Sequence, residues 1–69
     1  MAKVFELDFG VAVDLNDISV AERLVDEDEN SILTCWLKSD PNWPVTVSYI
    51  SEKRRDAVYA DLLEAWSTI

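Results

Sequence analysis

The sequence has no histidine, one cysteine (Cys35), one glycine (Gly10) and two prolines among its 69 residues. The lack of histidine excludes histidine-ligated metal sites and histidine acid–base catalysis. A single cysteine excludes an intramolecular disulfide, which favours a reducing, cytoplasmic setting. One glycine is too few for a loop that cradles phosphate. No run of about 18 apolar residues is present and the chain opens on an alternating pattern, so we expect neither a membrane span nor a signal peptide.

Negative charge is what the chain has in excess. Its formal net charge is −8 at pH 7, from 14 acidic and 6 basic residues. Residues 1–29 carry nine of the acids against two bases, whereas residues 30–69 carry five against four. Because 49% of the residues are apolar, we expect one folded domain over residues 1–69 with a modest core. Such a charge repels nucleic acid and anionic membranes and attracts basic surfaces.

Strict alternation marks residues 5–15. Every odd position from Phe5 to Leu15 is apolar, and every even position is acidic or small. Successive side chains of a strand point to opposite faces, so the pattern predicts one long strand with a dry face and an acidic face. Gly10 is expected to permit a bulge or bend within it.

The next stretch favours a short helix from about residue 19 or 20 to about 28. Ser19 and Glu22 have the spacing of a capping box, in which each side chain satisfies a backbone N–H of the other residue. Val20, Ala21, Leu24 and Val25 would form the apolar stripe of this helix.

The second half predicts a hairpin and a longer helix. Residues 32–38 and 45–50 have the composition of strands, and the prolines between them predict a turn over 40–44. Ser51 is expected to cap a helix from about 52 to about 67.

These elements define an α+β fold of order β-α-β-β-α, with a three-stranded mixed sheet and both helices on one face. The helices would cover a dry face made of Phe5, Leu7, Phe9, Val11, Val13, Leu33, Cys35, Leu37, Val45, Val47 and Tyr49. The bare face would carry Glu6, Asp8, Asp14, Thr34, Trp36, Thr46 and Ser48.

Residues 45–67 combine a strand, a serine-led cap at Ser51 and a helix that ends Leu-Leu-Glu-Ala-Trp-Ser. This segment, together with the expected element order, resembles the DinI-like family of small acidic bacterial and phage proteins that modulate RecA filaments. The resemblance implies a β-α-β-β-α fold and a partner of that kind. The last helix of that family is strongly acidic, whereas here residues 53–55 are basic and the acidic weight lies in residues 6–29.

Sites for chemistry are weakly indicated. Asp26, Asp28 and Asn30 match the first ligands of a calcium loop, but Ser31 and Leu37 occupy its glycine and glutamate positions. Carboxylates on an open strand face have no cleft to separate their pKa values, and a mid-strand Cys35 is expected to be a buried, inert thiol. We therefore expect no enzymatic activity, no metal ion and no other cofactor.

The leading hypothesis is an inhibitor or modulator whose acidic face binds a basic, nucleic-acid-binding protein in place of DNA or RNA. Phage anti-defence proteins, including anti-CRISPR proteins, are analogous in size and charge. The alternative is a structural or assembly subunit that makes contact, including a homodimer contact, through a strand edge or Trp36. The expected partner-binding residues are Glu6, Asp8, Asp14, Glu22, Asp26, Glu27, Asp28, Glu29 and Trp36.

Overall fold

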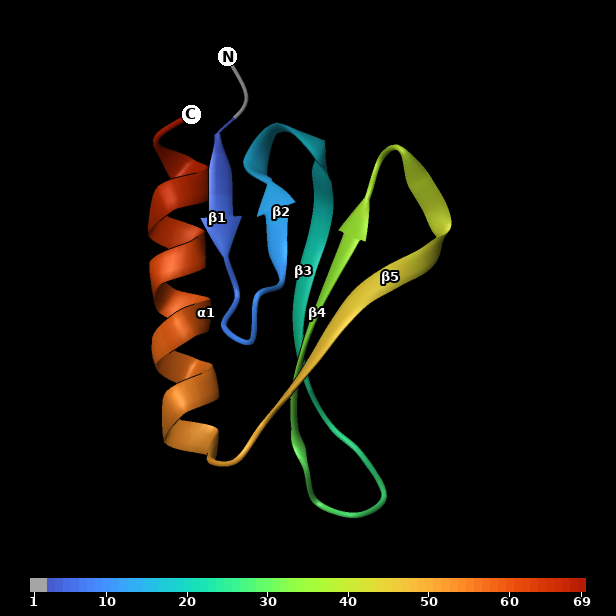
Figure 1. Ribbon diagram of the computed structural model, residues 1–69, viewed down its shortest axis with the longest axis vertical. Helices are drawn as coiled ribbons and strands as arrows, with labels where there is room; N and C mark the ends of the chain where they lie inside the picture. Colours follow the sequence, from blue (N-terminus) through green and yellow to red (C-terminus); the bar gives the residue numbers. More distant parts are fainter. Residues whose placement is uncertain (1–2) are drawn as a thin grey trace.

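The computed structural model describes residues 3–69, which form two antiparallel sheets and one α-helix (Figure 1). The elements are β1 (Val4–Glu6), β2 (Ala12–Asp14), the 3-10 turn η1 (Leu15–Asp17), β3 (Ile18–Val25), β4 (Ser31–Leu37), β5 (Asp40–Tyr49) and α1 (Glu52–Ser67). The first sheet pairs β1 with β2, and the second has the order β3-β4-β5. The α+β class is as predicted, but one expected helix is a strand and the larger sheet is antiparallel instead of mixed.

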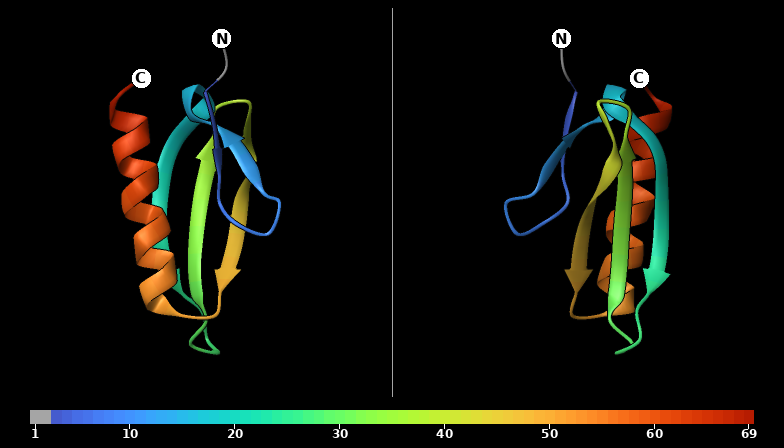
Figure 2. Two further views of the ribbon diagram at one scale, coloured as in Figure 1. Left: turned by 60° about the vertical axis from the view of Figure 1, so that its left-hand side comes forward. Right: turned by 90° about the vertical axis from the view of Figure 1, so that its right-hand side faces the viewer.

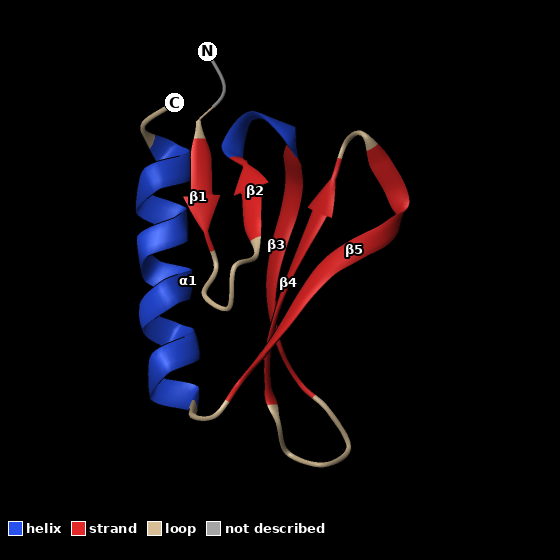
Figure 3. Cartoon of the chain, in the orientation of Figure 1, coloured by secondary structure: helices blue, strands red, loops and turns tan. Residues whose placement is uncertain are grey.

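One face of the larger sheet is covered and the other is open. Helix α1 and the β1–β2 hairpin lie on the same side of β3-β4-β5, and no described element lies over the opposite side (Figure 2, right; Figure 3). The core lies between these layers, and both sheets, η1 and α1 contribute apolar side chains to it. Its buried members are Leu7, Val13, Leu15, Ile18, Leu33, Cys35, Val47, Tyr49, Val58 and Leu62.

Residues 5–15 are a hairpin and not the single long strand that the alternation predicts. The chain reverses at Asp8, Phe9 and Gly10, which all have positive φ, of 78°, 57° and 75°. The turn is closed by a 2.7 Å hydrogen bond from the Leu7 N–H to the Val11 carbonyl. Both arms keep the alternation, so the pattern could not distinguish them from one strand. Phe9, expected on the dry face, is instead 67% exposed, with its ring centroid 5.9 Å from that of Tyr49.

The predicted helix over residues 19–28 is wrong, because residues 18–25 form β3 and the rest form a turn. Strand β3 pairs with β4 along its length, for example Ala21 opposite Cys35. The expected capping box does not form. The Ser19 hydroxyl donates to the Trp36 carbonyl at 3.1 Å, and the Glu22 carboxylate accepts from the Trp36 indole. Both side chains therefore support the sheet.

The second half of the chain follows the prediction closely. Strands β4 and β5 form the expected antiparallel hairpin, although β5 begins at Asp40, inside the predicted turn, and the chain reverses at residues 38–39. Pro41 and Pro44 fit within β5 because it is an edge strand. Helix α1 begins after Ser51, whose hydroxyl accepts from the Arg54 N–H at 3.1 Å, and spans the predicted residues 52–67.

Candidate functional site

The open face of the larger sheet is a grid of side chains set by the strand register. Alternation along β3 and β4 brings Val20 opposite Trp36, Glu22 opposite Thr34 and Leu24 opposite Ile32. Strand β5 extends the grid, with Thr46 opposite Thr34 and Ser48 opposite Ile32. Val20 with Trp36 and Leu24 with Ile32 therefore form two apolar rows across the strands. Glu22, Thr34 and Thr46 form a polar row between them.

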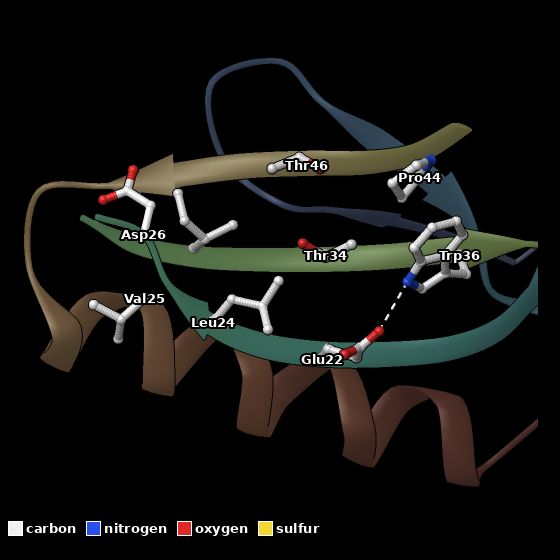
Figure 4. A pocket seen from close by; sticks show the side chains of 9 residues that line it. Glu22, Leu24, Val25, Asp26, Thr34, Trp36, Pro44 and Thr46 are labelled. Atoms are coloured by element: carbon white, nitrogen blue, oxygen red, sulfur yellow. Dashed lines mark hydrogen bonds between the residues drawn. The ribbon is translucent and has the colours of Figure 1, made fainter. Parts of the chain in front are cut away.

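The centre of this face is hollow, and we call it the open-face groove (Figure 4). Thr34 is only 4% exposed although no element covers it, because taller neighbouring side chains surround it. The Trp36 Nε1–H donates to Glu22 Oε1 at 2.8 Å, which holds the indole across the strands. The groove has a volume of about 580 Å³ and is lined by Glu22, Leu24, Val25, Asp26, Ile32, Thr34, Trp36, Pro44 and Thr46.

An acidic turn joins β3 to β4 at one end of the groove. The Asp26 carboxylate accepts hydrogen bonds from the backbone N–H groups of Asp28 (2.9 Å) and Asn30 (2.8 Å) and from the Asn30 amide (3.0 Å). These bonds, the Asn30 side-chain bond first, lower the pKa of Asp26. Asp26 thus organises the turn, whereas Glu27, Asp28 and Glu29 are exposed, and we call these three residues the acidic tip.

The other predicted acidic residues, Glu6, Asp8 and Asp14, lie on the β1–β2 hairpin and differ in their contacts. Asp8 accepts two 2.8 Å hydrogen bonds from the Arg54 guanidinium, which lower the pKa of Asp8. Asp14 accepts from the Asn16 N–H at 2.9 Å, and Glu6 is exposed on β1. The structure therefore divides the predicted site in two. Glu22, Asp26, the acidic tip and Trp36 lie together along the groove and its turn. Glu6, Asp8 and Asp14 lie separately, on the β1–β2 hairpin.

The arginines have roles that the sequence did not reveal. Arg55 is only 4% exposed and donates to the Leu24 carbonyl at 2.9 Å and to Asp56 at 3.0 Å. Arg23 also pairs with Asp56, at 3.4 Å, and lies 4.8 Å from the centre of the Tyr59 ring. The sequence contains one indication of this pairing, because the acidic residues Glu52 and Asp56 flank the basic residues 53–55.

Several groove residues were also missed because of the misassigned helix. Leu24 was placed on a helical stripe, and Ile32 and Pro44 were not assigned to any site. Val20, Glu22 and Leu24 are two residues apart and would share one face of a strand, whereas Val20, Ala21, Leu24 and Val25 would share one stripe of a helix, so the local pattern did not decide between the two.

Cys35 is buried, and burial raises the pKa of its thiol to about 11. Within residues 3–69 no cluster of three or more Cys, Asp or Glu side chains is arranged to hold a metal ion. Helix α1, the one α-helix of those residues, is not long and apolar enough to cross a membrane.

No family model matches the chain, and no match was found among curated proteins or among solved structures. The segment that resembles the DinI-like family, residues 45–67, forms the expected end of a strand and the expected helix, whereas the first helix of that topology is β3 here.

Proposed function

We propose that this chain is a non-enzymatic acidic protein that binds a basic, nucleic-acid-binding protein and inhibits or modulates it. The pairing of its charges carries the proposal. All three arginines are held by carboxylates of the same chain, Arg23 and Arg55 by Asp56 and Arg54 by Asp8. Within residues 3–69 the side chains of the acidic tip form no ion pair or hydrogen bond. The surplus negative charge is therefore presented outward.

Carboxylates fixed on a rigid turn can stand in for phosphates of a nucleic acid backbone. Asp26 supports the turn, because its carboxylate accepts three hydrogen bonds from Asp28 and Asn30. A partner that uses lysine and arginine to contact phosphates presents the complementary potential, which speeds association at low ionic strength. RecA-type filament proteins and the effector complexes of bacterial defence systems are partners of this kind.

The test is displacement of proteins from immobilised DNA. Nucleic-acid-binding proteins of the producing cell are loaded on the DNA at physiological salt, the chain is added, and released proteins are identified by mass spectrometry. We expect one or a few proteins to be released, and release to weaken as salt is raised.

Two charge-reversal variants make the test specific. One changes Glu27, Asp28 and Glu29 to Lys and leaves Asp26 intact. The other changes Asp40, Asp61 and Glu64 to Lys, which alters the net charge by the same amount on exposed positions elsewhere. We expect the first variant to lose displacement and the second to keep it. Equal loss in both, or release of every bound protein alike, would mean that the chain acts only as a polyanion.

A second candidate function is a structural or assembly subunit, and the edge strand β3 and the open-face groove favour it. Here Trp36 would anchor a protein contact, with a homodimer as the simplest case. Sedimentation of the pure chain at low and high salt tests this function. Self-association that persists at high salt supports it.

A further inference from the structure

The open-face groove combines apolar side chains with carboxylates, and we propose that it binds an amphipathic helix of the partner that carries a lysine or arginine between two apolar residues. The inference rests on the proposed function, and it specifies which part of a basic partner is held. Of the nine lining residues that the structure describes, Glu22 and Asp26 are acidic and none is basic. The groove itself therefore selects a cation.

The spacing of the rows favours a helix laid along the strands. Val20 and Leu24 mark the two apolar rows, and four residues of strand separate them, or roughly 13 Å. Residues seven or eight positions apart on one face of a helix are separated by roughly 11–12 Å, so they can reach both rows. A residue of the bound helix that is four positions from each of two residues eight positions apart lies midway between them, over Glu22. One carboxylate oxygen of Glu22 accepts from Trp36, which leaves the other for a cation.

The exposed apolar area gives such a helix something to bury. Val20 and Leu24 are 47% and 44% exposed, and Trp36, opposite Val20, is half-buried at one end of the groove. Tryptophan in a partly enclosed position is a common anchor of protein interfaces. The opposite face of the same sheet is already covered by a helix, α1, so this sheet supports helix packing (Figure 2).

Charge argues against a second copy of the chain as the occupant. Two copies packed through this face would bring Glu22 and Asp26 of each chain together, with no base of the groove between them. Each copy also carries a net charge of −8. Like charges brought together at an interface repel and weaken association, so a basic helix is the better complement.

Three synthetic peptides test the proposal directly. The first is a helix with two leucines eight positions apart and a lysine midway between them. The second has the same composition in scrambled order, and the third is the first peptide with its lysine replaced by glutamate. The protein carries Trp43→Phe and Trp66→Phe, so that Trp36 alone reports binding by fluorescence. We expect the first peptide to bind and shift the Trp36 emission to shorter wavelength, and the other two to cause no shift.

Two variants locate the binding. Thr46→Arg places a long cation in the groove, whereas Ala60→Arg adds the same charge on the exposed side of α1. We expect Thr46→Arg to weaken binding by about tenfold or more, equivalent to about 1.4 kcal/mol, and Ala60→Arg to leave it almost unchanged. Thermal melts establish that both variants are folded, and Glu22→Gln should reduce affinity without loss of fold.

Other results would overturn the proposal. These are equal binding of the scrambled basic peptide, equal effects of the two arginine variants, or self-association of the pure chain that Thr46→Arg abolishes. The displacement assay separates the two proposals. If Thr46→Arg still displaces proteins from DNA while the tip variant does not, the proposed function stands and the groove is not its binding site.

Discussion

Single side chains attach the β1–β2 hairpin to the rest of the molecule. Leu7 is fully buried, and its carbonyl accepts a hydrogen bond from the buried Tyr49 hydroxyl. Next to it, Asp8 binds the Arg54 guanidinium at the start of α1. The positive φ angles of the turn are unfavourable for Asp8 and Phe9, so these tertiary contacts must offset a local backbone cost.

The first prediction compares two neighbouring residues of this turn. Leu7→Asp should unfold the domain, since a buried carboxylate without a partner costs several kcal/mol. Asp8→Ala should stay folded with a smaller loss of thermal stability, because the ion pair with Arg54 is exposed to solvent. Thermal melts followed by circular dichroism measure both. A larger loss in Asp8→Ala than in Leu7→Asp would contradict the observed burial.

The second prediction concerns alkaline pH. Burial raises the pKa of Tyr49 from its ordinary value of 10.0 to about 12 and that of Cys35 from 9.0 to about 11. Both groups are neutral in the folded state and ionise more easily when unfolded. Their contribution to stability is therefore complete below pH 9 and is lost as pH rises through 9 to 12. Denaturant melts across this range should show this decline in the free energy of unfolding. In Tyr49→Phe, the free energy of unfolding relative to its value at neutral pH should fall less between pH 10 and 12.

At the scale of elements, the turn between β3 and β4 depends on one carboxylate. Asp26 satisfies two backbone N–H groups that otherwise have no partner in the hairpin, and Glu29 takes a left-handed conformation, with φ of 63°. The acidic tip is thus held by local hydrogen bonds, while β3 itself is held by its long pairing with β4.

The third prediction tests this turn. Asp26→Ala should speed the amide hydrogen exchange of Asp28 and Asn30, because both N–H groups lose their acceptor. Asp26→Asn keeps an acceptor oxygen and should retain most of the protection. Exchange measured by NMR distinguishes the two. Unchanged exchange in Asp26→Ala would mean that the turn does not depend on this side chain.

At the scale of the whole molecule, charge and shape divide the surface. One side of the sheet is closed by α1 and the hairpin, and the arginines that join these layers are neutralised by carboxylates (Figure 1). The other side presents the open-face groove with the acidic tip at its end. A basic partner would therefore meet negative charge and exposed apolar surface on the same face.

The fourth prediction is that the isolated chain binds neither DNA nor RNA. Its net charge is −8 and its three arginines are paired with carboxylates, so residues 3–69 leave no stripe of unpaired arginines to contact phosphates. Gel-shift assays with duplex and single-stranded probes at physiological salt should show free probe at micromolar protein. A shift that weakens with added salt would contradict the prediction.

Local patterns in the sequence were sufficient for the parts of the fold whose signals are short-range. Ser51 and the apolar spacing behind it predicted α1, and the strand composition of residues 32–38 and 45–50 predicted the β4–β5 hairpin, although its turn lies before the prolines. Alternation also placed Leu7 and Val13 in the core, and composition established the acidic charge. Each of these features depends on residues within a few positions of one another.

Tertiary structure decided the features whose partners are distant in the chain. Ser19, Glu22 and the apolar residues around them fit a helix or a strand, and pairing with β4, together with the bond from Trp36 to Glu22, selects the strand. The turn at Asp8 likewise makes contacts with residues distant in the chain, from Tyr49 to the Leu7 carbonyl and from Arg54, 46 residues away, to Asp8. Strand pairing and ion pairs of this range have no local signature, so neither the groove nor the grouping of its acids could be obtained from the sequence alone.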